Sequence, residues 1–243
     1  SIEAVTADGK LKSEPATTAG LYLGKPDEIP YSEAFDADPS KKYTIIDANE
    51  DGYTWKWSAG AGAMSNDYSW FTDANDWLLT PLLRLEGGWA YSLSFDAMAQ
   101  QDQVEKISAA YGTSGNPEDF TEIMPTTEYR GGNYTHTEKH FNIKQTDNYQ
   151  IGFHLTSQAL MWGVWFDNVQ VEKYIKLSAP DSVRNIRVTA ADEGKLSATI
   201  NFDAPSLNVG QDALQSITKI DLWRGDADGN NLALIHTFNA PKP

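Results

Sequence analysis

The segment DANDWLLTPLLRLEGGWAYSLSFDA at residues 73–97 decides the fold class. Within it a short apolar run breaks at a Thr-Pro step, and a Gly-Gly pair then predicts a turn. After the turn, apolar residues alternate with polar ones, which is the pattern of a half-buried strand. The segment WGVWFDNVQVEK at residues 162–173 has the same character. Neither segment contains a cluster of catalytic residue types, so both favour a binding sandwich over an enzyme.

The rest of the chain consists of short apolar runs separated by Gly, Asn, Asp and Pro. Almost no segment shows the 3.6-residue spacing of apolar residues that is typical of helices. Strands are predicted at residues 29–35, 43–47, 55–57, 77–80, 91–97, 106–111, 136–143, 149–155 and 162–171. This number of strands suits the two packed sheets of a jelly roll. The predicted fold class is therefore all-β, with a jelly-roll β-sandwich as its main part.

The composition limits the classes of partner. The 243 residues, 40% of them hydrophobic, suffice for one large or two modest folded domains. The formal net charge of -15 disfavours nucleic acids and anionic membrane surfaces, because both require a basic protein surface. The chain has no cysteine, which excludes disulfides and thiolate chemistry. No apolar run approaches the roughly 20 residues of a membrane helix, so no membrane insertion is expected, and any export signal is expected to lie outside this sequence.

Several pieces of the sequence occur together in one known family. They are IPYSEAFD at 29–36, TIIDANEDGYTWKW at 44–57, NDWLLTPLLRL at 75–85, YSLSFDA at 91–97, YQIGFHLTS at 149–157 and WFDNVQVEK at 165–173. On these pieces, residues 28–173 resemble the cleaved-adhesin, or choice-of-anchor J, jelly-roll modules of gingipain-type haemagglutinins and of surface proteins of anaerobic gut and oral bacteria. The resemblance implies a secreted or cell-surface bacterial module that serves adhesion or carbohydrate binding.

A second domain is predicted after residue 176. The pieces APDSVRNIRVTA, LSATINFDAP and ITKIDLWRGD resemble the front of a fibronectin type III domain, with Phe202 where that family commonly has Trp. Such a domain has seven strands in about 100 residues, so two closing strands are missing from this part of the chain. Residues 1–20 resemble those closing strands.

The predicted organisation is therefore a terminal type III segment at residues 1–24, a jelly roll at 25–176 and the front of a type III domain at 177–243. An open sandwich exposes unpaired strand edges. We therefore expect residues 1–20 to complete the C-terminal sheet, within the chain or by strand exchange between chains. The alternative is that they form an arm on the jelly roll.

Two carboxylates stand at unusual positions in the predicted strands. Strand alternation places Glu33 and Asp167 on the apolar faces of the first and last jelly-roll strands. An inward carboxylate is costly unless it is paired or bound to a metal. The resemblance to related jelly-roll carbohydrate-binding modules implies a structural Ca²⁺ near these strands, with Asp36 and Asp38 as further candidate ligands. The alternative is that each carboxylate caps backbone N–H groups at a strand end.

The loop DANEDG at residues 47–52 is a weaker metal candidate. Asp47, Asn49 and Asp51 provide oxygens at alternate positions, as at the opening of a calcium-binding loop. Ser58 occupies the twelfth position, where such loops have a bidentate Glu, and no helix follows. The alternative is a polar loop built from Asx turns.

Aromatic and polar residues suggest a ligand face. Several aromatic residues lie near Asp and Asn, a mixture suited to stacking on the apolar faces of sugars and bonding their hydroxyls. An outward polar row is predicted from Ser94, Asp96, Lys106, Ser108, His154 and Asn168. The candidate ligand-binding residues are Trp55, Trp57, Asp96, Lys106, His154 and Trp162. The alternatives are that the aromatic residues, Trp77 and Trp165 above all, belong to the core, and that the polar row is an ordinary solvated face.

Catalytic motifs are lacking from the sequence. There is no H-E-x-x-H, no G-x-S-x-G elbow and no phosphate-binding loop. Asp96 and Glu105 are the one pair considered for glycosidase chemistry. We therefore expect a non-catalytic module with glycans or host glycoproteins as partners and Ca²⁺ as a structural cofactor. The alternatives are a spacer that presents another domain and a glycoside hydrolase or lyase.

Overall fold

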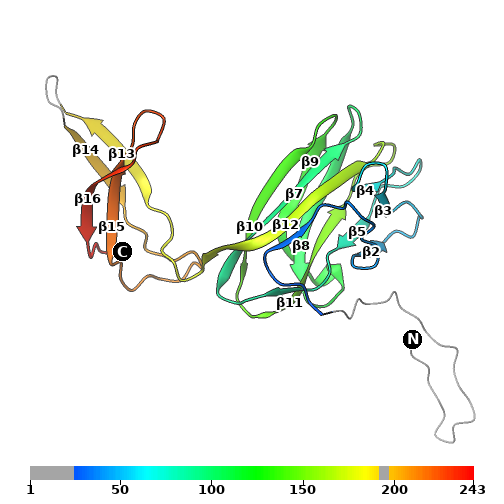
Figure 1. Cartoon of the computed structure of the whole chain (residues 1–243), viewed down its shortest axis with the longest axis horizontal. Coiled ribbons are helices and arrows are strands. Elements are labelled where there is room, and N and C mark those ends of the chain that lie inside the picture. The colour runs from blue at the N-terminus through cyan, green and yellow to red at the C-terminus, as the bar shows by residue number, and fades with distance from the viewer. Residues whose placement is uncertain (1–24, 192–196) are drawn as a thin grey trace, which may run out of the picture. The chain divides into compact units, whose positions relative to one another are not determined.

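The computed structural model describes residues 25–191 and 197–243, and this part of the chain is almost entirely β (Figure 1). Its elements are β1 (Tyr31–Glu33), β2 (Thr44–Asp47), β3 (Trp55–Ser58), β4 (Ala63–Asn66), β5 (Asp76–Leu79), β6 (Leu83–Leu85), β7 (Trp89–Ala99), β8 (Val104–Gly112), η1 (Pro117–Asp119), β9 (Thr121–Arg130), β10 (Thr135–Ile143), β11 (Asp147–Leu155), β12 (Val164–Lys176), β13 (Arg184–Ala190), β14 (Ala198–Asp203), β15 (Lys219–Arg224) and β16 (Ala233–Asn239). The all-β prediction is confirmed.

Each strand predicted in the central part of the chain is present, but β4, β6 and β9 were not predicted. In β9 the sequence pattern of a strand is interrupted by Pro125, which has no N–H to donate to a neighbouring strand. The strand tolerates this proline because β9 lies at the edge of its sheet. In β4 all four residues are buried, so the strand has no alternation of polar and apolar residues.

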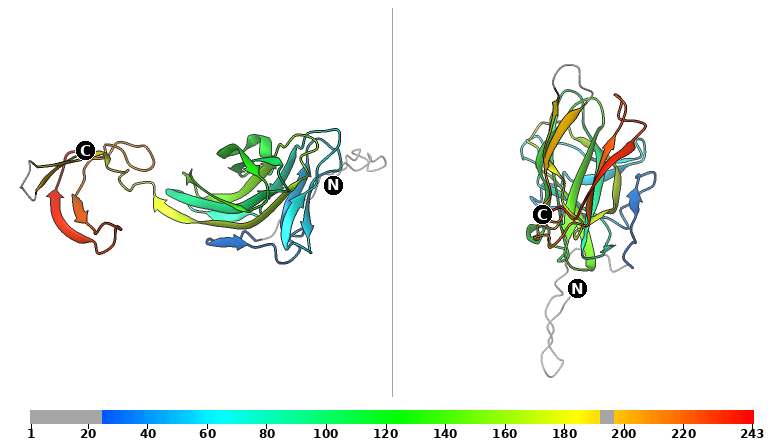
Figure 2. Two further views of the ribbon diagram at one scale, coloured as in Figure 1. Left: turned by 90° about the horizontal axis from the view of Figure 1, so that it is seen from above. Right: turned by 90° about the vertical axis from the view of Figure 1, so that its left-hand side faces the viewer.

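Two six-stranded sheets form the sandwich (Figure 1). The first sheet has the strand order β10-β7-β12-β4-β3, with β1 paired to β12. The second sheet has the order β2-β5-β11-β8-β9, with β6 paired to β11. Figure 2 shows the long yellow-green strand β12 bending along its length, as expected of strands in twisted, packed sheets. Strand β11 pairs antiparallel with β5, β6 and β8, and β12 pairs antiparallel with β1 and β4. The pairs β2–β5, β3–β4 and β8–β9 are antiparallel as well.

The core between the sheets is built from aromatic rings. Phe166 of β12 is fully buried, and its ring centroid lies 5.1 Å from that of Phe95, 4.6 Å from that of Phe153 and 5.6 Å from that of Trp55. Phe95 and Phe166 belong to the first sheet and Phe153 to the second, so these contacts join the two sheets. Such rings contribute both buried apolar area and specific edge-to-face geometry.

The chain divides into two compact units. Among the described residues, the first unit comprises 25–85, Leu93–Lys139 and Asp147–Val171, and the second comprises Glu86–Ser92, His140–Thr146, 172–191 and 197–243. The second unit contains the two-stranded sheets β13-β14 and β15-β16, which pack through an edge-to-face contact between Phe202 and Phe238 at 5.2 Å. The predicted closing strands at residues 1–20 lie outside the described residues. No helix in the described ranges is long and apolar enough to cross a membrane.

Candidate functional site

The outer face of the second sheet carries a stacked pair of rings. Trp77 of β5 and His154 of β11 are register neighbours, with ring centroids 4.1 Å apart and planes inclined by 10°. The adjacent Leu78 and Phe153 are fully buried in the core, so alternation places Trp77 and His154 on the outer side. Both side chains are half-buried. The expectation that Trp77 belongs to the core was wrong. The sequence already indicated this, because Trp77 is adjacent to Leu78 in a strand and the two side chains must point to opposite faces of the sheet.

A glycine beside the ring pair makes room for it. A Cβ atom added at Gly152 would lie 2.8 Å from Cδ2 of Leu79 and 3.0 Å from Cε3 of Trp77. These contacts show that the Leu79 and Trp77 side chains lie over the glycine. A larger residue at this position would displace the indole ring. We refer to Trp77, His154 and Gly152 together as the ring platform.

The charge state of the ring platform is set by burial. Nε2 of His154 lies 2.7 Å from Oδ1 of Asn75, an acceptor, so this nitrogen carries the proton and donates. Burial lowers the pKa of His154 to about 4. The imidazole is therefore neutral at pH 7, and the ring platform has no formal charge.

An NMR titration tests this assignment. The imidazole resonances of His154 should titrate with a midpoint near the lowered pKa of about 4. Because the native state resists protonation, His154 stabilises the fold above the ordinary pKa of about 6.5, and this contribution is lost as the pH falls towards 4. A midpoint near 6.5 would show that the ring is solvated and not held in the stack.

The predicted polar row is divided between the two sheets. Ser108 is the register neighbour of His154, and Lys106 lies two residues away on the same outer face of β8. Asp96 and Asn168 belong to β7 and β12, which are strands of the first sheet. The row was therefore wrong as a single surface, because sequence alternation identifies outward positions but not the sheet to which a strand belongs.

Asp96 anchors a separate polar cluster on the first sheet. Its Oδ1 lies 2.7 Å from Nδ1 of His136, and its Oδ2 accepts a hydrogen bond of 2.8 Å from Nδ2 of Asn168. Both carboxylate oxygens are thus engaged by neighbouring side chains. This arrangement leaves Asp96 as a structural link between β7, β10 and β12.

The inward orientation predicted for Asp167 was wrong. Val164 and Phe166 are fully buried, as are Val169 and Val171, so the inward positions change parity within β12. The change occurs at Asn168, whose φ is 55°, a left-handed backbone conformation found at β-bulges. Trp165 and Asp167 are consequently half-buried on the outer side, and neither belongs to the core.

The carboxylates of the first metal hypothesis are engaged locally. Glu33 Oε1 accepts a 3.0 Å hydrogen bond from the Phe35 N–H, and Asp38 Oδ1 accepts one of 2.9 Å from the Ser40 N–H. Asp167 Oδ1 accepts from the N–H of the next residue at 2.7 Å. These contacts match the alternative reading of strand-end caps.

The same carboxylates also influence one another. Burial raises the pKa of Asp167 first, and the charges of Asp96, Asp36 and Glu33 raise it further. These acids therefore lie within electrostatic reach. Within residues 25–191 and 197–243, however, no three Asp, Glu or His side chains are arranged to hold a metal ion.

The loop at residues 47–52 is held by hydrogen bonds from backbone N–H groups to its side-chain oxygens. Oδ1 and Oδ2 of Asp47 accept from the N–H groups of Asp51 and Gly52 at 3.2 and 2.8 Å, and Oδ1 of Asp51 accepts from the Tyr53 N–H at 2.8 Å. Nδ2 of Asn49 donates to the carbonyl oxygen of Asp73 at 2.9 Å. Asp51 thus forms the Asx turn of the alternative hypothesis, whereas the bonds of Asp47 reach four and five residues along the chain.

Three oxygens beside this loop nevertheless lack hydrogen-bond partners. Oδ1 of Asp76, Oδ1 of Asn49 and Oγ1 of Thr54 are buried without a bond of standard geometry. Burial raises the pKa of Asp76 to about 6; the Asn66 and Thr54 side chains lower it, and the charges of Asp47 and Asp51 raise it. Buried unpartnered oxygens are rare and call for an explanation. This group, centred on Asp76, was missed in the sequence because Asp76 opens a strand and belongs to no motif.

The tryptophans predicted to bind ligand have different locations. Trp55 is buried, and its Nε1 donates to the carbonyl oxygen of Asp76 at 3.2 Å. Trp57 donates through Nε1 to the carbonyl oxygen of Phe35 at 2.7 Å. Trp55 is thus a core residue and not a ligand residue. Trp162 is exposed in the loop before β12, where its ring stacks on that of Tyr68.

Glu105 does not pair with Asp96 as the hydrolase alternative requires. Its side chain is only 1% exposed, and its Oε1 accepts a 2.8 Å hydrogen bond from the Gly163 N–H. Asp96 instead lies on the outer side of the first sheet. Burial raises the pKa of Glu105 to about 7. A carboxyl group that is buried and bonded to the backbone has no access to a substrate on the surface.

Glu105→Gln should flatten the pH dependence of stability. The native state binds the Glu105 proton more tightly than the unfolded chain, so stability is full below the ordinary pKa of about 4.5 and falls as the pH rises through about 7. The loss is on the order of 3 kcal/mol. Urea unfolding at pH 5 and pH 8 measures it in both proteins. The exposed Glu122→Gln is the control, and an unchanged pH slope in Glu105→Gln would contradict the assignment.

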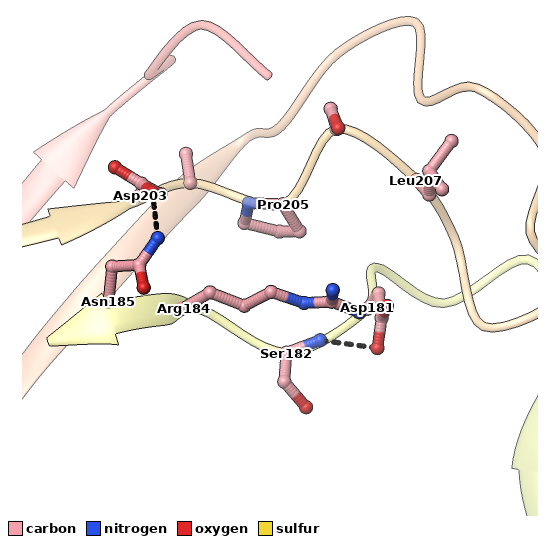
Figure 3. A pocket seen from close by; sticks show the side chains of 9 residues that line it. Asp181, Ser182, Arg184, Asn185, Asp203, Pro205 and Leu207 are labelled. Atoms are coloured by element: carbon pink, nitrogen blue, oxygen red, sulfur yellow. Dashed lines mark hydrogen bonds and ion pairs between the residues drawn. The ribbon is translucent and has the colours of Figure 1, made fainter.

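The second unit contains a surface hollow beside β13 and β14. Figure 3 shows Arg184, Asp181 and Pro205 along its wall. Arg184 forms an ion pair of 2.8 Å with Asp181, and Nδ2 of Asn185 donates to Asp203 at 2.5 Å. Since these polar groups already bond to one another, the hollow is a weaker candidate for a binding site than the ring platform.

The chain is similar to solved adhesin and carbohydrate-binding domains. The K1 cleaved adhesin domain of Lys-gingipain from Porphyromonas gingivalis W83 is 17% identical, with a TM-score of 0.49 over 60% of this chain and 98% of that domain. The CBM22-2 xylan-binding domain from Paenibacillus barcinonensis Xyn10C is 13% identical, with a TM-score of 0.42 over 59% and 99%. The N-terminal cellulose-binding domain of Cellulomonas fimi β-1,4-glucanase C is 17% identical, with a TM-score of 0.42 over 63% and 100%.

A likeness at these identities and TM-scores says nothing about what this chain binds. No protein-family model matches the sequence. No curated protein matches it significantly.

Proposed function

We propose that this chain is a non-catalytic, secreted or cell-surface module that binds neutral glycans on the outer face of its second sheet. The observation that carries the proposal is the stacked, half-exposed pair of Trp77 and His154. Aromatic rings pack against the apolar C–H faces of sugars, and nearby polar groups bond the hydroxyls. Ser108 and Lys106 supply such groups on the same face.

Charge supports a neutral ligand. The His154 ring is uncharged at pH 7 because burial lowers its pKa to about 4. The whole chain has a formal net charge of -15, which repels acidic polymers. Host glycoproteins that display neutral sugars are therefore suitable partners, and uronic-acid or sulfated polymers are not.

Binding of the full chain to a glycan panel tests this proposal. We expect selective binding to neutral oligosaccharides or mucin-type glycoproteins, measured in calcium buffer and again in EDTA. Absence of binding to every glycan of the panel would favour the alternative that the chain is a spacer. Release of reducing sugar from any bound polysaccharide would favour the hydrolase alternative.

We further propose that a structural Ca²⁺ is held at the group centred on Asp76. Calcium prefers carboxylate, amide and other hard oxygens, and the unpartnered oxygens of Asp76, Asn49 and Thr54 have this chemistry. Asp47 and Asp51 supply negative charge close by, since both raise the pKa of Asp76. A bound cation would compensate the buried carboxylate and rigidify the loop between β2 and β3.

Removal of calcium should lower the melting temperature of the wild type by roughly 5 to 10 °C, the shift expected for a ligand present at about 100 times its Kd. Asp76→Asn should abolish this response. Asp67→Asn, at a carboxylate paired with Lys56 on the surface, should retain it. Equal melts of the wild type in calcium and EDTA would contradict the metal proposal, and loss of the response in Glu33→Gln alone would move the ion to the first and last strands.

A further inference from the structure

Two loops at one end of the first unit expose a group of large apolar side chains. We call this group the aromatic rim; its members are the exposed Trp70, Phe71, Leu160 and Trp162 and the half-buried Tyr68 beside them. Trp70 is 60% exposed, Phe71 94%, Leu160 45% and Trp162 44%. The Tyr68 ring lies 5.5 Å from that of Trp70 and 6.3 Å from that of Trp162. Exposed apolar groups gathered in one place mark interaction surfaces, whereas single exposed residues do not.

The two loops of the aromatic rim are held together by the backbone. The Leu160 N–H donates to the Ser69 carbonyl oxygen at 3.0 Å, and the Ala74 N–H donates to the Ser157 carbonyl oxygen at 2.8 Å. Asp73 Oδ1 accepts from the Ala159 N–H at 2.9 Å. These bonds hold the backbones of the two loops together before any ligand arrives, which reduces the entropy cost of ordering the loops on binding.

The backbone of the second loop is strained. Leu160 and Trp162 have φ values of 69° and 49°, in the left-handed region that costs residues other than glycine about 1 to 3 kcal/mol. Gly163 follows with φ of 101°, and a Cβ there would lie 2.2 Å from the carbonyl oxygen of Asn66. The chain therefore exposes the apolar side chains of Leu160 and Trp162 to water, at a cost in free energy from both the strained backbone and the hydration of apolar surface.

The aromatic rim continues from the ring platform. Its first loop leads into β5, where Trp77 lies, and its second loop follows β11, where His154 lies. Asn75, at the end of the first loop, is the residue that fixes His154 through the 2.7 Å contact. The two loops of the rim thus join β5 and β11 at the same end of these adjacent antiparallel strands, which carry the platform. A ligand that extends from the platform towards this end reaches the rim.

We propose that the glycan bound at the ring platform continues onto the aromatic rim, so that the ligand is an extended neutral oligosaccharide and not a single sugar. This inference rests on the proposed function. The aromatic rings of the rim supply stacking surfaces for sugar units beyond the platform. Asp67 and Asp73 beside the rim are negatively charged, which disfavours an acidic chain or an anionic lipid surface at this place.

Calorimetry with oligosaccharide ladders tests the inference. The probes are cello-, xylo-, malto- and N-acetylchito-oligosaccharides of increasing length, with oligogalacturonate as the acidic comparison, each titrated into the full chain. We expect affinity to rise with chain length for one neutral ladder. In a Trp70→Ala, Trp162→Ala double variant this rise should disappear, with about 10-fold weaker binding of the longest member and unchanged binding of the shortest. Trp223→Ala, a change at an exposed tryptophan of the second unit, should match the wild type.

The outcomes separate the two proposals. If the double variant binds the longest member as the wild type does, the inference is overturned while the ring platform stands. If it loses short and long members equally, the rim is itself the primary site, and both the inference and the ring platform are overturned. If the wild type binds none of the ladders, the proposed function fails and the inference fails with it. Preference for oligogalacturonate would contradict both proposals, because each states that the ligand is a neutral glycan.

Discussion

Trp77→Ala should weaken glycan binding by about 30-fold or more. The indole is half of the stacked pair on the second sheet, and removal of a central aromatic anchor typically costs about 2 kcal/mol or more of binding free energy. His154 would also lose its stacking partner, so the remaining ring would be less well fixed. Isothermal titration of the variant with the glycan selected by the wild type measures the effect.

A loss of folding must be separated from a loss of the ligand contact. Trp77 lies over Gly152, so its removal leaves a gap at the surface of the sheet. Trp77→Phe retains a ring at this position and should recover part of the affinity, whereas a structural cavity alone would not produce this order. Wild-type affinity in Trp77→Ala, with an unchanged melting curve, would exclude the ring platform as the binding site.

Phe166→Ala should lower the free energy of unfolding of the sandwich by about 3 to 5 kcal/mol, the usual cost of truncating a buried Phe. Phe166 is fully buried, and its ring contacts those of Phe95, Phe153 and Trp55. These contacts join the two sheets, so the cavity would lie where neither sheet can collapse without moving the other. Urea unfolding followed by tryptophan fluorescence and circular dichroism measures the change.

The matched control for this prediction is Phe71→Ala. The Phe71 side chain is almost entirely exposed, so its truncation removes little buried area and should change stability by less than about 0.5 kcal/mol. A loss below about 1 kcal/mol in Phe166→Ala would mean that the core repacks around the cavity. Loss of cooperativity in the variant would instead show that the ring holds the sheets in one arrangement.

The sequence alone identified the strands of the jelly roll, because alternating apolar residues and Gly or Pro breaks are local signals. It also disfavoured nucleic acids and anionic membrane surfaces through the excess of acidic residues, since net charge needs no structure. It did not identify β9, where Pro125 interrupts the pattern at a sheet edge, or β4, where burial on both sides removes the alternation.

Only the tertiary structure decided which residues share a surface. Alternation predicts which face of the sheet a side chain lies on only while the backbone stays extended. The left-handed conformation of Asn168 breaks the alternation in β12, so Asp167 lies on the outer face and not on the inner one. The sequence also does not state which strand pairs with which. Trp77 and His154 became neighbours through the register of β5 and β11, while Asp96 and Lys106, close in sequence, came to lie on different sheets. Contacts between strands distant in the chain depend on the packing of the whole core, and for this reason the site emerged only from the fold.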